Sequence, residues 1–131
     1  MGEFFLGYRR VAMTEDEILV CVHIPLPSPS NRTFLRSYKQ ARRRDDDIGI
    51  VSAGLQVQLE PVNENDKKQW RIVNARFSFG GMGPTTILTK NTQQKLIGEL
   101  WTKATINKAC ELALKEMPLD EMTPGGQPEY R

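Results

Sequence analysis

The sequence predicts an α+β fold, in which an antiparallel sheet of about four strands carries C-terminal helices packed on one face. Strand-like segments come first in the chain, and segments with helical spacing follow them. The length of 131 residues suits one core, and 39% hydrophobic and 26% charged residues are ordinary values for a globular protein. We therefore expect residues 1–131 to form a single domain.

The first expected strand is the apolar run Glu17–Leu26. It is rich in β-branched residues, and Pro25 and Pro27 leave too little length for a helix. A continuous apolar run of this kind predicts a strand covered on both faces. The loop Pro27–Asn31 follows, and Thr33–Ala41 is the second expected strand, although a helix also fits this segment.

Two further segments alternate with a period of two, which predicts strands with one apolar face. In the first, Val51, Ala53, Leu55, Val57 and Leu59 alternate with Ser52, Gly54, Gln56 and Gln58; in the second, Val73, Ala75, Phe77 and Phe79 alternate with Asn74, Arg76 and Ser78. The polar segment Glu60–Gln69 joins them. This arrangement predicts a long hairpin with an exposed connection.

The last third of the chain has helical spacing. One stripe is formed by Ile106, Ala109, Cys110, Ala113, Leu114 and Met117. Thr102 is the expected N-cap of this helix, and Pro118 ends it. A shorter helix is expected before it, capped near Asn91 and containing Leu96, Ile97, Leu100 and Trp101.

No group of residues has the spacing of a catalytic or metal site. Cys21 and Cys110 lie far apart and are expected to be small core residues in a reduced, intracellular protein. His23 stands alone in its strand, where packing or surface exposure is the expected role. We therefore predict neither catalytic residues nor a metal site within this chain.

Charge and hydropathy argue against two classes of partner. The net charge of +2 is too small to indicate nucleic acid or an anionic membrane. No stretch reaches the roughly 20 apolar residues that a membrane span needs, and no secretory signal is present. We expect a cytoplasmic protein that binds neither nucleic acid nor membrane, with a peroxisomal location as the alternative.

The segment around residue 43 is the most unusual local feature. Lys39 and Arg42–Arg44 run directly into Asp45–Asp47. One interpretation is a solvated loop whose charges pair locally. A second is that the blocks of opposite sign hold an anionic cofactor and tune its electronics. A third is that Arg42–Arg44 bind nucleic acid or an acidic protein in a free-standing interaction module, which the adjacent aspartates disfavour.

The glycine-rich segment Phe79–Thr86 does not match a phosphate-binding loop. It lacks the lysine of a P-loop, and its glycines do not have the spacing that precedes a dinucleotide-binding helix. We expect these glycines to let the backbone turn, or approach another element, where the strand ends.

Five ordered strings resemble the flavoprotein segment of the xanthine dehydrogenase and xanthine oxidase family. They are FFLGYRR, EDEILVCVHIP, SYKQARRRDDDI, FGGMGPTT and PGGQPEYR, which together extend over nearly the whole chain. Aldehyde oxidases share this layout but usually lack the RRxDDI pattern, so they are the second choice. The fold that the resemblance implies is that of the CO dehydrogenase flavoprotein C-terminal domain.

The resemblance implies that this chain is the C-terminal subdomain of an FAD-binding module. In the family, hypoxanthine and xanthine are oxidised to urate at a molybdopterin centre, and electrons pass through two 2Fe–2S clusters and FAD to NAD or oxygen. The matching flavin-contacting residues are Leu19, which would pack on the isoalloxazine, and Lys39, whose cation would stabilise reduced flavin. Arg43 and Asp46 are implied to tune the flavin potential.

The resemblance also implies that most of the enzyme lies outside this chain. The pyrophosphate-binding part of the flavin module, the cluster cysteines and the molybdenum domain have no counterpart in the sequence, whose two cysteines are too few for a cluster. We therefore expect a piece excised from a larger, homodimeric enzyme, whose partners are the remaining domains of the parent. The isolated piece should be inactive.

Overall fold

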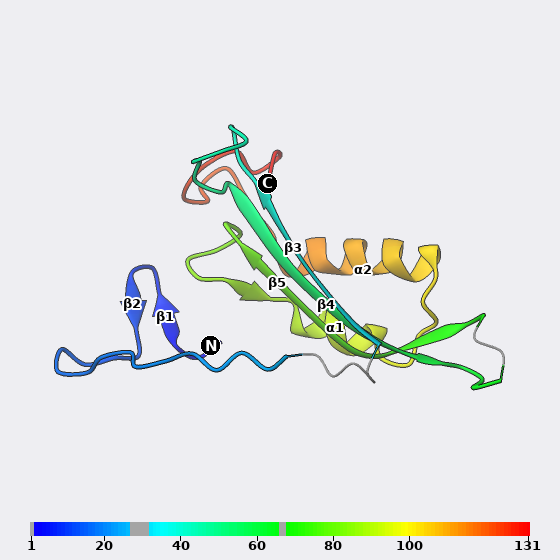
Figure 1. The fold of residues 1–131 in the computed structure, drawn as a ribbon. Coiled ribbons are helices and arrows are strands. Elements are labelled where there is room, and N and C mark those ends of the chain that lie inside the picture. Colours follow the sequence, from blue (N-terminus) through cyan, green and yellow to red (C-terminus); the bar gives the residue numbers. More distant parts are fainter. Residues whose placement is uncertain (1, 27–31, 66–67) are drawn as a thin grey trace.

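The computed structural model describes residues 2–26, 32–65 and 68–131. Its main feature is a four-stranded antiparallel sheet in the order β3-β4-β5-β6 (Figure 1). The strands are β3 (Arg32–Gln40), β4 (Val51–Pro61), β5 (Trp70–Gly80) and β6 (Ile87–Leu88). The predicted α+β class and antiparallel sheet are confirmed.

The long hairpin is formed by β4 and β5, as the alternating residues predict. Both strands extend further than expected, because pairing continues to Pro61 and Trp70. The register shifts between Gln58, which pairs with Asn74, and Leu59, which pairs with Ile72, so Val73 is the extra residue of a bulge in β5. The predicted connection is therefore shorter, at residues 62–69, and residues 66–67 lie outside the described part of the chain.

Two helices follow the sheet: α1 (Lys90–Leu96) and α2 (Lys103–Glu116). The predicted cap of α2 is confirmed, since the Thr102 hydroxyl accepts the Thr105 backbone N–H at 3.2 Å. The shorter helix exists but ends earlier than predicted. Gly98, at φ +88°, turns the chain, and Leu100 then pairs with Arg71 in an isolated β-bridge.

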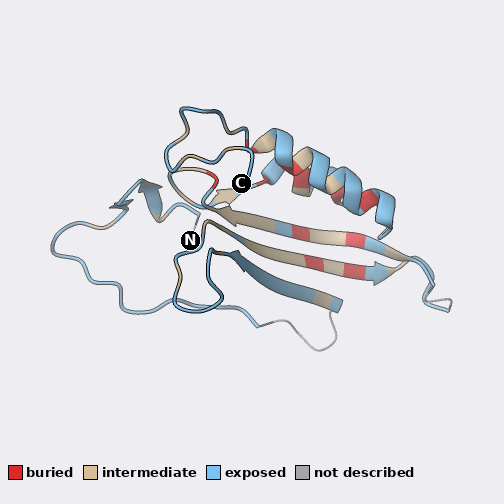
Figure 2. Cartoon of the chain, turned by 90° about the horizontal axis from the view of Figure 1, so that it is seen from above, coloured by how far each residue is buried: buried red, intermediate tan, exposed pale blue. Residues whose placement is uncertain are grey.

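Both helices pack on one face of the sheet and form two small cores. One core contains Ile72 and Leu96, each 1% exposed, and the other contains Met82, Ala113 and Met117. Figure 2 shows the buried residues along β4, β5 and the helices, whereas β3 is almost entirely exposed. Neither helix has the length and apolar character that crossing a membrane requires.

The expected strand at Glu17–Leu26 is wrong for this chain. The described residues of this run are extended but unpaired, and the fourth strand of the sheet is β6 instead. A strand needs a neighbour for its backbone groups, and none of the described residues pairs with this run. The expected loop Pro27–Asn31, which follows it, lies outside the described residues.

The expectation that both cysteines are core residues is also wrong, since Cys21 and Cys110 are both exposed free thiols. His23 is exposed too, with its Nε2 3.4 Å from the Cys21 sulfur. The predicted stripe on α2 is only partly buried. Ala113 and Met117 are in the core, whereas Leu114 is exposed.

The N-terminal part contains a small hairpin, β1 (Phe5–Gly7) with β2 (Arg10–Val11). Neither strand belongs to the main sheet. Figure 1 shows this hairpin and the extended segment after it beside the sheet rather than within it. The described N-terminal residues therefore add little to the core.

Candidate functional site

The face of the sheet opposite the helices carries only small side chains around Lys39. Lys39 pairs in register with Ser52, which pairs with Gly80. The next row is Ser37, Gly54 and Ser78, and the larger Leu88 follows at its far end on β6. Because side chains alternate between faces, these residues point away from the helix side, where Tyr38 lies.

We name Ser37, Ser52, Gly54, Ser78 and Gly80 the small-residue platform. A Cβ atom added to Gly54 would lie 2.8 Å from the Ser78 hydroxyl oxygen. One added to Gly80 would lie 2.5 Å from the Ser52 hydroxyl oxygen. A larger residue at either glycine would therefore displace a serine hydroxyl, and with glycine in place the platform presents a nearly flat polar surface to a ligand.

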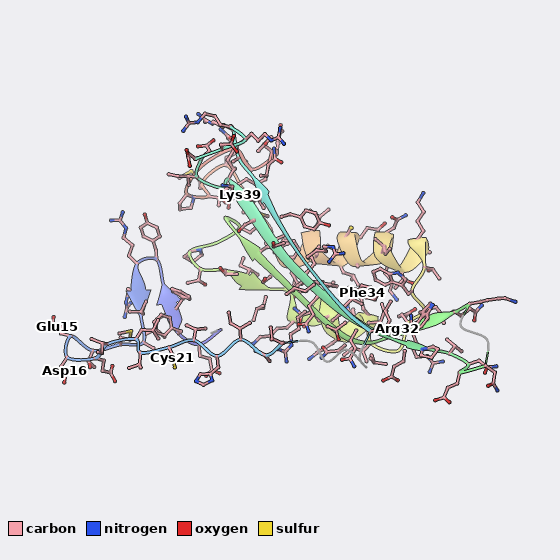
Figure 3. All side chains as sticks on the ribbon, viewed as in Figure 1. Glu15, Asp16, Cys21, Arg32, Phe34 and Lys39 are labelled. Carbon is pink, nitrogen blue, oxygen red and sulfur yellow. The ribbon has the colours of Figure 1, made fainter. Side chains whose placement is uncertain are left out.

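The charged loop, residues 41–50, follows directly after Lys39 and Gln40. Its fold depends on Asp47, whose carboxylate accepts the backbone N–H groups of Arg43 at 2.8 Å and Ile48 at 2.9 Å. The Lys39 ammonium donates to the Asp47 backbone carbonyl at 2.9 Å. Figure 3 shows Lys39 beneath this loop, far along β3 from Arg32 and Phe34. Lys39 is therefore fixed at the edge of the platform.

The two other predicted residues of the loop, Arg43 and Asp46, are neighbours in space. Arg43 donates from Nη2 to the Asp46 backbone carbonyl at 3.1 Å. Asp46 has φ +49°, a conformation that asparagine and aspartate tolerate better than most residues. Lys39, Arg43 and Asp46 are thus brought together by one loop.

One of the three interpretations of this segment was a solvated loop in which arginines and aspartates pair with one another. The loop is exposed, but its charged side chains do not pair in this way. Within the described residues, no arginine of the loop makes an ion pair of 4.0 Å or less with an aspartate. The charged side chains bind backbone groups instead. The hydrogen bond from the Arg43 N–H, with a smaller contribution from the nearby Arg42 charge, holds the pKa of Asp47 below its usual 3.8. Arg42 and Arg44 remain exposed to solvent.

The glycine-rich segment packs against the end of the charged loop, as a close-approach role predicts. Gly81 has φ +82°, and a Cβ at this position would clash with the Ile50 carbonyl oxygen. The Gly81 carbonyl in turn accepts a hydrogen bond from Arg131 at 2.7 Å. The Gln40 side-chain amide donates to the Tyr130 hydroxyl at 2.8 Å. The C-terminal residues therefore support the same end of the sheet.

Leu19, the fourth predicted residue, is not brought to this end. It lies in the extended segment, 57% exposed. In Figure 1 that segment runs below the sheet, whereas the charged loop lies at its top. The structure of this chain therefore assembles three of the four predicted residues.

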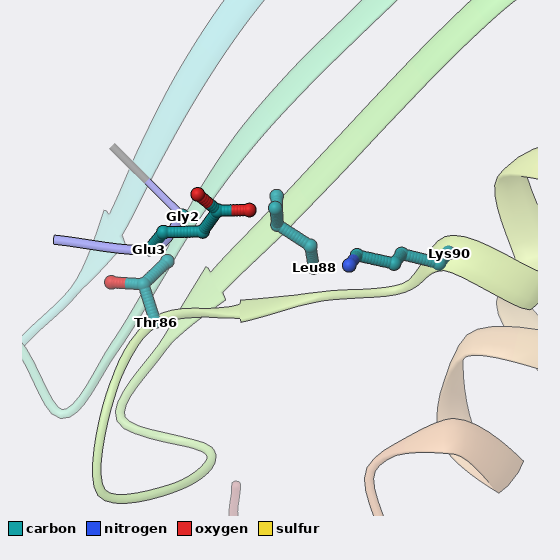
Figure 4. Close-up of a pocket in the computed structure, with 5 residues that line it drawn as sticks. All are labelled: Gly2, Glu3, Thr86, Leu88 and Lys90. Atoms are coloured by element: carbon teal, nitrogen blue, oxygen red, sulfur yellow. The ribbon is translucent and has the colours of Figure 1, made fainter. Parts of the chain in front are cut away.

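Two cavities lie away from the charged loop. A groove of about 560 Å³ between the sheet and α2 is lined mostly by apolar side chains, among them Phe34, Tyr38, Trp101 and Ile106. A shallower pocket of about 490 Å³ lies beside β6, and Figure 4 shows Glu3 and Lys90 on either side of Leu88 there. Neither pocket includes the platform or the loop residues. Across the described ranges, no three His, Cys, Asp or Glu side chains are grouped as a metal site requires.

Sequence reasoning missed the platform and Asp47. The signal for the platform was present, because the polar positions of the alternating β4 segment include serine and glycine at residues 52 and 54. The matching positions on β5 emerge only from the register of the pairing. Nothing in the run of three aspartates distinguishes Asp47 from its neighbours until the loop is folded.

Comparisons with known proteins agree with this architecture. Residues 36–131 match the family model of the CO dehydrogenase flavoprotein C-terminal domain. The chain is 38% identical to a xanthine dehydrogenase from Dictyostelium discoideum over 100% of its length, and 37% identical to xanthine dehydrogenase 2 from Arabidopsis thaliana over 98%. It spans only 10% and 9% of those proteins.

Solved structures show the same fold. Carbon monoxide dehydrogenase from Hydrogenophaga pseudoflava matches 98% of this chain and 41% of its own with a TM-score of 0.76 at 18% identity. Quinoline 2-oxidoreductase from Pseudomonas putida 86 matches 98% and 40% with a TM-score of 0.73 at 22% identity. The family match, the fold and the xanthine dehydrogenase relatives agree, and the chain belongs to the CO dehydrogenase flavoprotein C-terminal domain family.

Proposed function

We propose that this chain is the C-terminal subdomain of an FAD-binding module in a larger enzyme of the xanthine dehydrogenase type. The observation that carries the proposal is the flat platform beside Lys39, in a chain whose family is named for a flavoprotein. FAD, when bound, supplies the redox chemistry. The residues of this chain shape the surface and the electrostatic field around its ring system.

The platform fits a planar, partly polar ring. Ser52, Gly54 and Gly80 present no side chain longer than a hydroxymethyl group, so a ring can lie close to the backbone. The Lys39 ammonium at the edge can hydrogen-bond to a ring oxygen or nitrogen while its stem stays against the loop. The fit therefore concerns the ring end of FAD, and we infer that the phosphates are bound by other parts of the parent.

Arg43 and Asp46 act on the flavin through their charges. A cation near the ring favours the reduced, more negative flavin, and an anion disfavours it. The Arg43 guanidinium is held against the Asp46 backbone carbonyl, so both residues lie on the same part of the loop. We infer that Leu19 packs on the ring once the extended segment is positioned by the parent.

We infer the remaining properties from the relatives. The parent would oxidise hypoxanthine and xanthine to urate at a molybdenum centre and pass electrons through iron–sulfur clusters and FAD to NAD or oxygen. We further infer a cytoplasmic homodimer, with this piece inactive when isolated. Nicotinate is a second candidate substrate of the parent. It is supported by a nicotinate hydroxylase from Emericella nidulans, which is 34% identical over 100% of this chain.

A bulky side chain on the platform tests the location of the flavin. In the full-length parent, Ser52→Phe should lower the FAD content per protein at least about tenfold, because the phenyl ring would occupy the flavin surface. Gln58→Phe is the matched control, since it lies on the same strand and face but about 20 Å away. The readout is flavin absorbance, with circular dichroism as the check on folding. Equal FAD contents in both variants would contradict the proposal.

A further inference from the structure

The C-terminal tail, residues 118–131, folds back to the end of the sheet that carries the charged loop (Figure 1). Turns within the tail determine its course. The Gly126 N–H donates to the Thr123 carbonyl at 3.1 Å, and the Arg131 N–H donates to the Gln127 carbonyl at 3.0 Å. The last two side chains of the tail are therefore presented to the sheet by a hydrogen-bonded backbone.

These two side chains bind the end of the sheet at two points. The Arg131 guanidinium donates to the Gly81 carbonyl at 2.7 Å and to the Pro124 carbonyl at 3.3 Å. Such bonds are charge-assisted and stronger than bonds between neutral groups, and the Arg131 Nε atom is buried. The Tyr130 hydroxyl accepts the side-chain amide of Gln40 at 2.8 Å. We name Tyr130 and Arg131 the C-terminal brace.

The two contact points of the brace are also joined to each other. The Gln40 carbonyl accepts the Ile50 N–H at 2.7 Å, and this bond closes the charged loop. Gly81 lies so near the Ile50 carbonyl that no Cβ atom fits between them. The brace, Gln40, Ile50 and Gly81 thus form a closed circuit of contacts, in which one member cannot move without disturbing the next.

This circuit borders the candidate flavin site. Gln40 directly follows Lys39 on β3, and Gly81 directly follows Gly80 of the small-residue platform. Because side chains alternate along a strand, Gln40 points to the face opposite Lys39. Tyr130 therefore contacts β3 from the side away from the platform. A ring lying on the platform would not meet the Tyr130 hydroxyl, but a displacement of Gln40 would displace Lys39.

We propose that Tyr130 and Arg131 are positioning residues of the flavin site, which hold Lys39 and the Gly80 end of the platform in place. They act through the backbones of β3 and β5 rather than by touching the ring. This proposal rests on the proposed function, because it requires the flavin to lie on the platform. It makes the flavin reduction potential depend on two residues that are distant in the sequence from the strands they hold.

Amide hydrogen exchange in the FAD-free, full-length parent tests the brace itself. Tyr130→Phe removes only a hydroxyl from a ring that is 54% exposed, so the fold should remain intact. The hydrogen-bonded amides of Arg43, Ile48 and Ile50 should exchange about three- to tenfold faster, as loss of one hydrogen bond predicts. Tyr38→Phe is the matched control, because it removes an exposed hydroxyl from the same strand and face as Gln40. Equal exchange in both variants would overturn the proposal.

The second contact point is tested by the same measurement. Arg131→Gln breaks the bonds to Gly81 and Pro124 and should speed the exchange of the loop amides at least as much as Tyr130→Phe. Its control is Arg71→Gln, which removes an exposed arginine at the opposite end of β5. Loop exchange that is the same in these two variants would exclude Arg131 from the brace.

A redox titration of the FAD-loaded parent tests the positioning role. Tyr130→Phe should make the flavin reduction potential more negative, because a less firmly held Lys39 stabilises reduced flavin less. It changes no charge, so direct electrostatics cannot cause this shift. The shift should be smaller than that of Lys39→Met and should disappear when Tyr130→Phe is added to Lys39→Met, because the hydroxyl acts through Lys39.

The same shift in both backgrounds, or no shift in either, would overturn the positioning role. Failure of the proposed function is recognised separately. If the flavin lies elsewhere, Ser52→Phe keeps its FAD, whereas the faster loop exchange of FAD-free Tyr130→Phe remains. If the brace is wrong, Ser52→Phe still loses FAD, whereas Tyr130→Phe exchanges like Tyr38→Phe.

Discussion

Lys39, near the end of β3, and Asp46, in the charged loop, carry opposite charges close to the same loop backbone. Lys39 is held by the Asp47 carbonyl, and the Asp46 carbonyl accepts a hydrogen bond from Arg43. Removing the Lys39 ammonium breaks its bond to the Asp47 carbonyl, but either substitution leaves the two hydrogen bonds of the Asp47 carboxylate in place. The two residues are therefore suited to a pair of substitutions with effects of opposite sign.

In the full-length parent, Lys39→Met should make the flavin reduction potential more negative, because a cation that favours reduced flavin is lost. Asp46→Asn should make it less negative, and asparagine tolerates the positive φ of this position. Lys108→Met, which removes an exposed lysine paired with Glu99 on the helix side, is the control. The measurement is a spectroscopic redox titration. Shifts of the same sign in both loop variants would contradict electrostatic tuning.

At the scale of elements, α1 depends on a carboxylate from α2. Its N-cap residue, Thr89, makes no side-chain cap bond. The Glu116 carboxylate instead accepts the backbone N–H groups of Asn91 at 3.0 Å and Thr92 at 2.8 Å, as well as the Thr92 hydroxyl at 2.7 Å. Glu116 thus satisfies N–H groups that a helix start leaves unpaired, and it joins the two helices.

Glu116 should make the stability of the chain depend on pH. Burial raises its pKa, but the hydrogen bonds from Thr92 and Asn91 outweigh burial and hold the pKa below the usual 4.5. A depressed carboxyl pKa stabilises the fold fully above pH 4.5, and the contribution is lost as the pH falls through the folded pKa. Glu116→Gln should therefore lower the free energy of unfolding at pH 7 by about 0.5–2 kcal/mol and flatten its decline in acid.

Urea unfolding followed by circular dichroism at pH 7 and at several values below 4.5 checks this prediction. Glu111→Gln is the matched control, because Glu111 lies on the same helix and is exposed, with no contact to the start of α1 among the described hydrogen bonds. The control should retain the acid dependence of the original chain. Parallel curves for Glu116→Gln and the original chain would show that the carboxylate does not stabilise the fold in this way.

The elements that could be predicted from the sequence are those specified by neighbouring residues. The alternation of β4 and β5 and the Thr102 cap are local patterns, and the structure confirms them except at Val73, where a bulge in β5 buries Ile72 instead. The strand at Glu17–Leu26 failed because a strand also needs a partner, which no local pattern reveals. The cap of α1 is supplied by Glu116, 24 or 25 residues away, and so could not be seen in the sequence.

The candidate site also combines features set by neighbouring residues with features set by distant contacts. Lys39, Arg43 and Asp46 are close in sequence, and one loop brings them together. The platform depends on register across three strands, and Leu19 lies exposed in the extended segment, away from the charged loop. The sequence therefore predicted the charged residues of the candidate site but not the small-residue platform beside them.

At the scale of the whole molecule, two helices cover less than the whole sheet. The groove between β3 and α2 leaves Phe34 50% exposed and Trp101 42% exposed. Arg36 also lines this groove and contributes a cation among apolar side chains. An apolar cavity with one positive group should bind a flat aromatic anion in the isolated chain.

The fluorescent aromatic sulfonate ANS is a suitable probe for this groove. The isolated chain should enhance its emission and shift it to the blue, because the rings enter the apolar cavity while the sulfonate meets Arg36. Phe34→Gln should weaken ANS binding several-fold without unfolding the chain, since Phe34 is half exposed. Tyr8→Gln, which removes an aromatic ring that is 70% exposed but lies outside the groove, should bind like the original chain. Titration of both variants, with urea midpoints to verify folding, decides the matter: equal affinities would place the bound dye elsewhere.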